Sequence, residues 1–229
     1  MNEENLRKLC AKKALEYIKN NTVIGLGAGR NIACLIELLS KDMEKNDLKI
    51  RVVTPSDNTK NMCIKFGIEV LPTCLVEEID VAFDGCGEVD EKFYASKGGG
   101  GVFTKEKIIA SMAKEYILLI DEQKLKKELS CNHPVSLEVI KDSLGYVTKI
   151  VKNLGGNPVV RTSNNKDGYL LTDDGNYILD VNFKVIDDFR KLDDNLNNIV
   201  GVVGTSLFTR EVTNLIVAGE SGIRVISKN

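Results

Sequence analysis

The stretch TVIGLGAGRN, from Thr22 to Asn31, joins a short apolar strand pattern to the start of a helix pattern. Its glycines allow a sharp backbone turn and can direct N–H groups toward an anion at the N-terminus of the helix. Strand and helix patterns alternate on both sides of this turn. Because apolar strands alternating with helices are typical of a parallel sheet covered on both faces, the first half of the chain predicts an α/β domain.

The expected elements of this domain follow from residue period and from glycine and proline positions. Strands are expected at 22–26, 49–53, 68–71, 79–83 and 116–120. Helices are expected at 5–20, 32–39, 58–66 and 105–115. Two short strands near the end of the chain, 215–217 and 224–226, are expected to return to the same sheet. The predicted class is α/β with a Rossmann-like, mostly parallel sheet.

The pattern changes after about Leu129. Strands are expected at 135–140, 159–162, 169–172, 177–183 and 199–203, with helices at 142–154 and 187–198. Asp173-Asp174-Gly175-Asn176 indicates a hairpin turn. This order predicts a second, smaller α+β domain with a split βαβ, ferredoxin-like arrangement. The expected domains are 1–129 with 204–229, and 130–203, the smaller one expected to mediate self-association.

Composition excludes several functional classes. The 229 residues include 31 Lys and Arg against 33 Asp and Glu, so no broad basic surface is available for nucleic acid. The longest apolar runs, such as 32–36 and 116–120, fall far short of the roughly 18 residues of a membrane span. The charged N-terminal segment does not look like a secretory signal, so a cytoplasmic location is expected.

Cysteine and histidine usage limits the chemistry further. The six cysteines form no C-x-x-C pair, and His133 is the only histidine. Cys131 and His133 lie close together but lack the further ligands that a zinc site needs, so no metal site is expected. Carboxylates and lysines are therefore expected to carry any acid–base chemistry.

The glycine turn favours a phosphate or sugar over a dinucleotide. A dinucleotide site would require glycine at the position of Arg30 and an acidic residue at the end of the next strand. That strand is instead followed by Thr54-Pro55-Ser56. The alternative is that these glycines only allow close packing.

A second group of polar residues follows the strand expected at 79–83. Three carboxylates lie within Asp84-Gly85-Cys86-Gly87-Glu88-Val89-Asp90, which is either an acid–base cluster or an ordinary solvated loop. Lys97-Gly98-Gly99-Gly100-Gly101 comes next, and four successive glycines are costly to order unless a ligand must approach the backbone closely. Their N–H groups could stabilise an oxyanion, and Glu106 lies in the first turn of the following helix.

Taken together, these motifs resemble the A type of ribose-5-phosphate isomerase. The resemblance rests on the glycine turn, on Asp84-Gly85, and on longer segments along the chain. These segments are Lys97-Gly98-Gly99-Gly100, Thr104-Lys105-Glu106-Lys107-Ile108-Ile109-Ala110-Ser111, Asp121-Glu122-Gln123-Lys124, Leu154-Gly155-Gly156, Asp174-Gly175-Asn176 and Gly201-Val202-Val203.

The resemblance implies a cofactor-free aldose–ketose isomerase of the non-oxidative pentose phosphate pathway. It would interconvert D-ribose 5-phosphate and D-ribulose 5-phosphate through an enediolate. By position, Glu106 would move the proton between C1 and C2, Lys97 would stabilise the oxyanion, and Asp84 would help shuttle the hydroxyl proton. The implied substrate-binding residues are Arg7, Ala28, Gly29, Arg30, Asn31, Asp84, Gly85, Cys86, Gly87, Lys97, Gly98, Gly99, Gly100 and Lys124. A homodimer or homotetramer is also implied.

Two departures from the family pattern leave other functions open. Gly87 stands where the family usually has a second aspartate, and Ala28, Arg30 and Asn31 replace hydroxyl residues of its substrate loop. We expect Asp84, Lys97 and Glu106 to suffice, with Glu88 or Asp90 covering part of the lost role. The main alternative is a sugar-phosphate-binding protein on the same fold that has lost catalysis. A third hypothesis is acyl or coenzyme A transfer, which the short chain disfavours.

Overall fold

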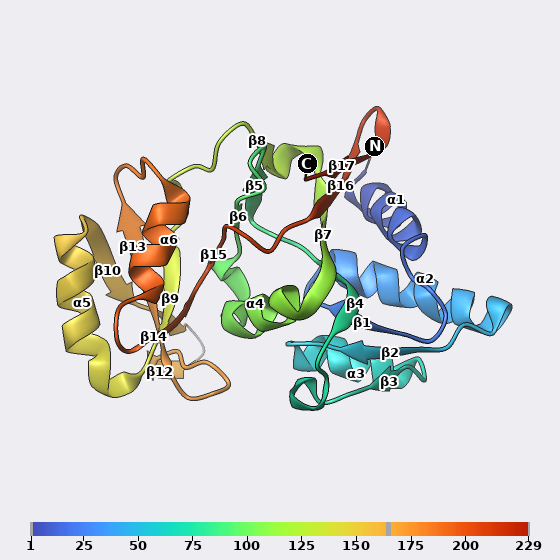
Figure 1. The fold of residues 1–229 in the computed structure, drawn as a ribbon, viewed down its shortest axis with the longest axis horizontal. Coiled ribbons are helices and arrows are strands. Elements are labelled where there is room, and N and C mark those ends of the chain that lie inside the picture. The colour runs from blue at the N-terminus through green and yellow to red at the C-terminus, as the bar shows by residue number, and fades with distance from the viewer. Residues whose placement is uncertain (1, 164–165, 229) are drawn as a thin grey trace.

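The computed structural model describes residues 2–163 and 166–228 and contains a seven-stranded sheet in the order β17-β16-β7-β4-β1-β2-β3 (Figure 1). Its strands are β1 (Thr22–Leu26), β2 (Ile50–Val53), β3 (Glu69–Val70), β4 (Ile79–Asp84), β7 (Ala113–Asp121), β16 (Asn214–Gly219) and β17 (Gly222–Ser227). All neighbouring pairs are parallel except β16 and β17. The mostly parallel sheet and the return of the last two strands to it are thus confirmed.

Helices cover both faces of this sheet. They are α1 (Glu3–Leu15), α2 (Arg30–Asn46), α3 (Asp57–Lys65) and α4 (Phe103–Met112). Side chains of the first three helices pack on one face, in a core that includes Leu35, Phe83 and Ile117. Helix α4 packs on the other face, against Ala82 and Leu118. Alternate residues of each strand therefore belong to different cores.

The helix expected at 5–20 ends early, at Leu15. Another error in this half is the helix expected at 105–115. It ends at Met112, because Ala113 already pairs with Ile79 and the strand continues to Asp121. Pairing along the whole of β4 outweighs the helical pattern of the residues just before Tyr116. Helix α2 differs in the opposite direction, since it runs on to Asn46.

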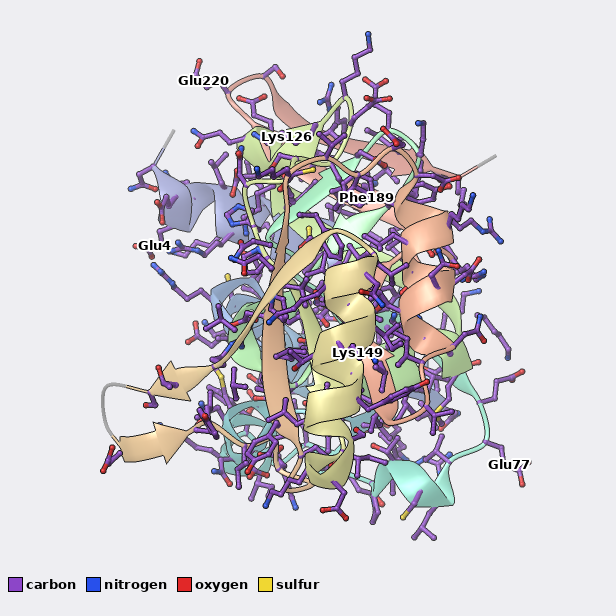
Figure 2. All side chains as sticks on the ribbon, turned by 90° about the vertical axis from the view of Figure 1, so that its left-hand side faces the viewer. Glu4, Glu77, Lys126, Lys149, Phe189 and Glu220 are labelled. Atoms are coloured by element: carbon purple, nitrogen blue, oxygen red, sulfur yellow. The ribbon has the colours of Figure 1, made fainter. Side chains whose placement is uncertain are left out.

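The smaller sheet has four antiparallel strands in the order β10-β13-β9-β14. Its elements are β9 (Val135–Val139), α5 (Leu144–Asn153), β10 (Gly156–Val160), β13 (Tyr177–Phe183), α6 (Phe189–Asn197) and β14 (Val202–Thr205). Figure 2 shows α5 and α6 side by side, and both contribute to one core with the sheet. This order and these connections are those of the expected split βαβ arrangement.

Three strands expected in this region are displaced along the chain. The strand expected at 159–162 is β10, which begins at Gly156 and ends at Val160. The strand expected at 169–172 is instead β12 (Lys166–Tyr169), which pairs with β11 (Thr162–Ser163). The strand expected at 199–203 begins only at Val202, because residues 199–201 form the turn that ends α6, with Gly201 at φ +98°. Strand β14 continues to Thr205, while the domain boundary at residue 203 stays a prediction.

A third sheet, which the sequence patterns did not predict, lies between these two parts (Figure 1). It consists of β5 (Glu88–Asp90), β6 (Ala95–Ser96), β8 (Leu125–Lys126) and β15 (Leu207–Phe208), in the order β15-β6-β5-β8. None of the helices that the structure describes is long and apolar enough to cross a membrane.

Candidate active site

A cavity of about 910 Å³ opens where β1, β4 and β7 end. The carboxyl ends of parallel strands are the usual ligand-binding edge of such sheets. The smaller domain contributes Pro134, Ser136 and Arg161 to the opposite wall. All of the catalytic and substrate-binding residues that the resemblance implies line this cavity, from Arg7 in α1 to Lys124 after β7, whereas Glu88 and Asp90 do not. Their roles remain predictions.

Three buried charged side chains meet in the wall of the cavity. Lys97 Nζ lies 2.9 Å from Asp84 Oδ2 and 3.4 Å from Glu106 Oε2, and it also donates to the carbonyl oxygen of Gly85. An ammonium group has three protons, so these contacts account for all of its donors. Asp84 ends β4, Lys97 follows β6 and Glu106 lies in the first turn of α4.

Burial and charge set the protonation of this cluster. Burial, together with the negative charge of Asp84, raises the pKa of Glu106 to about 7, although the charge of Lys97 acts in the opposite direction. The pKa of Lys97 is raised above its usual range, because the charges of Asp84 and Glu106 outweigh the desolvation that would lower it. Near neutral pH the cluster therefore holds a permanent cation and a carboxyl group that can both accept and release a proton.

The glycine turn after β1 combines packing with access. A Cβ atom on Gly25 would overlap Ala82 and Ile109, and one on Gly27 would overlap the Asp84 carboxylate. The close-packing alternative therefore holds for these two glycines. Gly29 differs, because it has φ +96° and open space around it, and it lies with Ala28, Arg30 and Asn31 on the cavity wall.

Arg7, Arg30 and Lys124 contribute basic side chains to the cavity wall. Arg7 forms an ion pair with Glu3, and Arg30 approaches the same carboxylate at 3.9 Å. Lys124 Nζ donates to the carbonyl oxygen of Cys86 at 3.0 Å. Asn31 is turned inward and donates to the carbonyl oxygen of Leu119 at 2.6 Å. Two arginines and a lysine are thus available to bind an anion in the cavity.

The segment after Asp84 is neither a carboxylate cluster nor a solvated loop. Glu88 and Asp90 are buried in β5 and do not line the cavity. Asp90 accepts hydrogen bonds from the backbone amides of Lys92, Tyr94 and Leu129, while Glu88 accepts one from Ser130 Oγ. The expectation that either residue replaces the missing aspartate is therefore wrong. Cys86 is buried beside Lys97, and burial raises the pKa of its thiol to about 12.

The glycine run after Lys97 forms a tight turn against the smaller domain. Gly98–Gly100 is a short 3₁₀ turn that ends at Gly101, whose φ is +72°. A Cβ atom on Gly98 would overlap Ser136 Oγ, whereas Gly99 has open space around it and is exposed to the cavity. Glycine is therefore needed for different reasons along this one turn.

Sequence patterns missed four residues that support the site, which are Tyr116, Ser136, Arg161 and Asp180. Arg161 donates to both oxygens of Asp180, to Gly98 O at 2.9 Å and to Ser136 Oγ at 2.8 Å. The Tyr116 hydroxyl donates to Asp84 Oδ2 at 3.0 Å. These contacts join residues between 19 and 63 positions apart in the chain, which no local motif reveals.

The described part of the chain contains no group of three or more histidine, cysteine, aspartate or glutamate side chains that could hold a metal ion. His133 Nε2 lies 4.0 Å from Glu88 Oε1 at the edge of the cavity, and the imidazole is exposed.

Comparisons with known proteins agree with this geometry. The family model described as ribose 5-phosphate isomerase A (phosphoriboisomerase A) matches residues 51–222. Ribose-5-phosphate isomerase A of Methanocaldococcus jannaschii is 36% identical over 229 residues, covering 100% of both chains. The corresponding protein of Thermosynechococcus vestitus is 36% identical over 218 residues, 95% of this chain and 92% of that protein.

Solved structures extend the likeness to the fold. The structure of the M. jannaschii isomerase superposes with a TM-score of 0.92 at 34% identity, covering 99% of this chain and 100% of that chain. A D-ribose-5-phosphate isomerase in complex with phospho-erythronic acid has a TM-score of 0.93 at 35% identity, with full coverage of both chains. The matched residues, the shared fold and the full-length identity show that the chain belongs to the ribose 5-phosphate isomerase A family.

Proposed function

We propose that this protein interconverts D-ribose 5-phosphate and D-ribulose 5-phosphate, with Glu106 as the group that transfers the proton. The observation that carries the proposal is the state of the Glu106 carboxyl. It is buried in the wall of an open cavity beside the permanent Lys97 cation, and its pKa is raised to about 7. A general base is most effective when its pKa lies near the working pH. Family membership supports the identity of the reaction.

The isomerisation needs one carbon-bound proton to move. In the proposed reaction Glu106 removes the proton from C2 of the open-chain aldose, and the electron pair moves toward the C1 carbonyl oxygen to form an enediolate. Glu106 then returns the proton to C1, while the O2 hydroxyl proton moves to O1 with the help of Asp84. Atoms and charge balance, because no group leaves the substrate.

The developing negative charge on oxygen needs fixed positive partners. Lys97 Nζ lies between Asp84 and Glu106, and the Gly98–Gly100 turn faces the cavity beside it. Donors that are oriented before the reaction can lower the barrier by about 3–4 kcal/mol each. The phosphate group would then lie near Arg7, Arg30 and Lys124, which also line the cavity.

The test is turnover of ribose 5-phosphate by the purified protein, measured as ketose formed, with and without a chelator. We expect turnover in both conditions. We expect Glu106→Gln to abolish turnover and to leave sugar-phosphate binding largely intact, because the amide keeps the shape of the side chain but cannot accept the proton. Unchanged turnover in that variant would remove Glu106 from the role of base.

Gly87 motivates the alternative of a binding protein without activity. A Cβ atom at this position would lie 3.2 Å from the carbonyl oxygen of Ser96, which is a tight contact. If the natural protein binds ribose 5-phosphate without turnover and Gly87→Asp restores turnover, the binding-protein alternative is correct. A transferase would instead require an added thioester.

A homodimer or homotetramer and a cytoplasmic location are further parts of the proposal. Exposed apolar side chains on the smaller domain support self-association, since Tyr146 is 55%, Val200 80% and Val203 45% exposed. Light scattering coupled to size-exclusion chromatography would give the mass, and a monomer of 25.3 kDa would contradict the expectation of self-association.

A further inference from the structure

Tyr116 is a buried tyrosine whose hydroxyl contacts Asp84 in the charged cluster of Asp84, Lys97 and Glu106. Strands β4 and β7 are parallel neighbours in which Tyr116 pairs with Ala82, and Asp84 lies two residues further along β4. Two residues of a strand span roughly 6–7 Å, a distance that the long phenol side chain bridges along the same face of the sheet. Its hydroxyl donates to Asp84 Oδ2 at 3.0 Å.

This contact completes the hydrogen bonding of the Asp84 carboxylate. Oδ2 accepts from Tyr116 and contacts Lys97 Nζ at 2.9 Å. Oδ1 accepts from the backbone amide of Gly85 at 2.7 Å and from that of Ala28 at 3.3 Å. Four donors from four parts of the chain thus hold the carboxylate in one orientation. Tyr116 supplies the only side-chain hydroxyl among them.

The ring of Tyr116 is held as firmly as its hydroxyl. It stacks on Phe208, with centroids 6.0 Å apart and 17° between the ring planes. The Tyr116 backbone amide donates to Thr213 Oγ1, and its carbonyl oxygen accepts from the Thr213 amide, both at 3.0 Å. A phenylalanine would satisfy all of these contacts, so packing does not account for the hydroxyl.

Burial and the charges of Asp84 and Glu106 raise the pKa of Tyr116 well above its ordinary range. The phenol therefore keeps its proton near neutral pH and remains a hydrogen-bond donor there. A buried hydroxyl is unfavourable without a partner, and here the partner is a carboxylate, for which a hydrogen bond is stronger than for a neutral acceptor.

We propose that Tyr116 is a positioning residue that acts through Asp84, orienting its carboxylate and spreading its negative charge so that Lys97 and Glu106 keep their working geometry. The inference rests on the proposed isomerase function. The charged and titratable groups around Glu106 are Asp84 from β4, Lys97 after β6 and Tyr116 from β7. Without the hydroxyl, the Asp84 charge is less well stabilised and opposes ionisation of Glu106 more strongly.

The test compares Tyr116→Phe with the natural protein. The matched control is Tyr17→Phe, because Tyr17 lies in the segment between α1 and β1, and this change removes a tyrosine hydroxyl away from the cavity. In Tyr116→Phe we expect kcat to fall about tenfold with KM nearly unchanged, and the melting temperature to fall moderately, because one buried hydrogen bond to a charged group is lost. The acid limb of the kcat profile should move to higher pH. Tyr17→Phe should leave both kcat and the profile unchanged.

Making Tyr116→Phe a second time, in the Asp84→Ala variant, distinguishes positioning through Asp84 from a general packing role. In Asp84→Ala the hydroxyl has lost its acceptor, so adding Tyr116→Phe should cause no further loss of kcat. An equal tenfold loss in both backgrounds, or an unshifted pH profile in Tyr116→Phe, would overturn the inference.

A readout without turnover distinguishes this inference from the proposed function. The side-chain carboxyl of Glu106 can be titrated by ¹³C NMR and assigned by loss of its signal in Glu106→Gln. We expect its midpoint to rise in Tyr116→Phe. A raised midpoint in a protein that does not isomerise ribose 5-phosphate would reject the proposed function and support the positioning role, whereas an unchanged midpoint would reject the positioning role.

Discussion

Glu106 shows how much the surroundings of one side chain determine its chemistry. A glutamate in the first turn of a helix is ordinarily ionised and exposed, and the dipole of the helix favours its charge. Here the side chain is buried, and desolvation together with Asp84 raises its pKa to about 7. Lys97 keeps the shift from being larger. The same residue type thus changes from a surface stabiliser into a group that exchanges protons near neutral pH.

We predict that kcat/KM rises with pH up to about 7 and is level above it. The base must be ionised to accept a proton, so activity is lost as the pH falls through the raised pKa, by about tenfold per pH unit well below it. Asp84→Asn removes the negative charge that opposes ionisation and should move this limb to lower pH, besides lowering kcat. A pH profile of both proteins measures the shift, and a limb that stays in place would contradict the assigned cause.

The Gly98–Gly100 turn shows what an element contributes beyond its residues. Its amides lie beside Lys97 because the backbone packs directly against β9, where Ser136 Oγ occupies the space that a side chain on Gly98 would need. Ser136 Oγ in turn donates to Asp180 Oδ1 at 2.7 Å and cannot move freely. The position of the turn is therefore determined by the strand behind it.

We predict that Gly98→Ala destabilises the protein by about 1–3 kcal/mol, the usual effect of overpacking, and also lowers kcat because the turn must shift away from Ser136. Gly145→Ala is the matched control. Gly145 lies in α5 with open space around it, so alanine there should raise stability by up to about 1 kcal/mol and leave kcat unchanged. Thermal unfolding and the isomerase assay give both quantities, and a fully active Gly98→Ala would show that the turn does not need this position.

For the molecule as a whole, the smaller domain does more than cover the cavity. Arg161 lies between β10 and β11 of that domain, and its guanidinium joins Asp180 in β13 to Gly98 O beside Lys97. The planar guanidinium of Arg161 binds both partners at once, since separate nitrogens donate to the Asp180 carboxylate and to the Gly98 carbonyl oxygen. The site is thus complete only when the two domains are in contact.

We predict that Arg161→Met lowers kcat at least about tenfold, because a small displacement of an oriented catalytic group has a large effect on rate. Arg161→Lys should recover little of the loss, since one ammonium cannot reproduce the fork. The exposed Arg190 provides the control, and Arg190→Met should keep full activity. Circular dichroism would show whether each variant is folded, and near-normal turnover in folded Arg161→Met would contradict this role of the domain contact.

Much of the architecture could be predicted because its signals are local. The apolar run at Thr22–Leu26, the turn that follows it and the hairpin turn before Tyr177 depend on residue period and glycine position within a few residues. The errors occur where distant pairing takes over. Ala113 joins a strand because Ile79 lies beside it, and Glu88 and Asp90 are buried because Ala95–Ser96 and Leu125–Lys126 pair with their strand.

The candidate site divides in the same way. The linear sequence was sufficient for the family and for the α/β class, because the motifs that carry them are short and contiguous. The same motifs led to Asp84, Lys97 and Glu106, whose catalytic roles stay predictions. The raised pKa of Glu106, the orientation of Asp84 by Tyr116 and the support of Gly98 by Arg161 follow only from the folded chain. Desolvation and hydrogen bonding between distant segments depend on packing, and packing is a property of the three-dimensional structure that no local pattern contains.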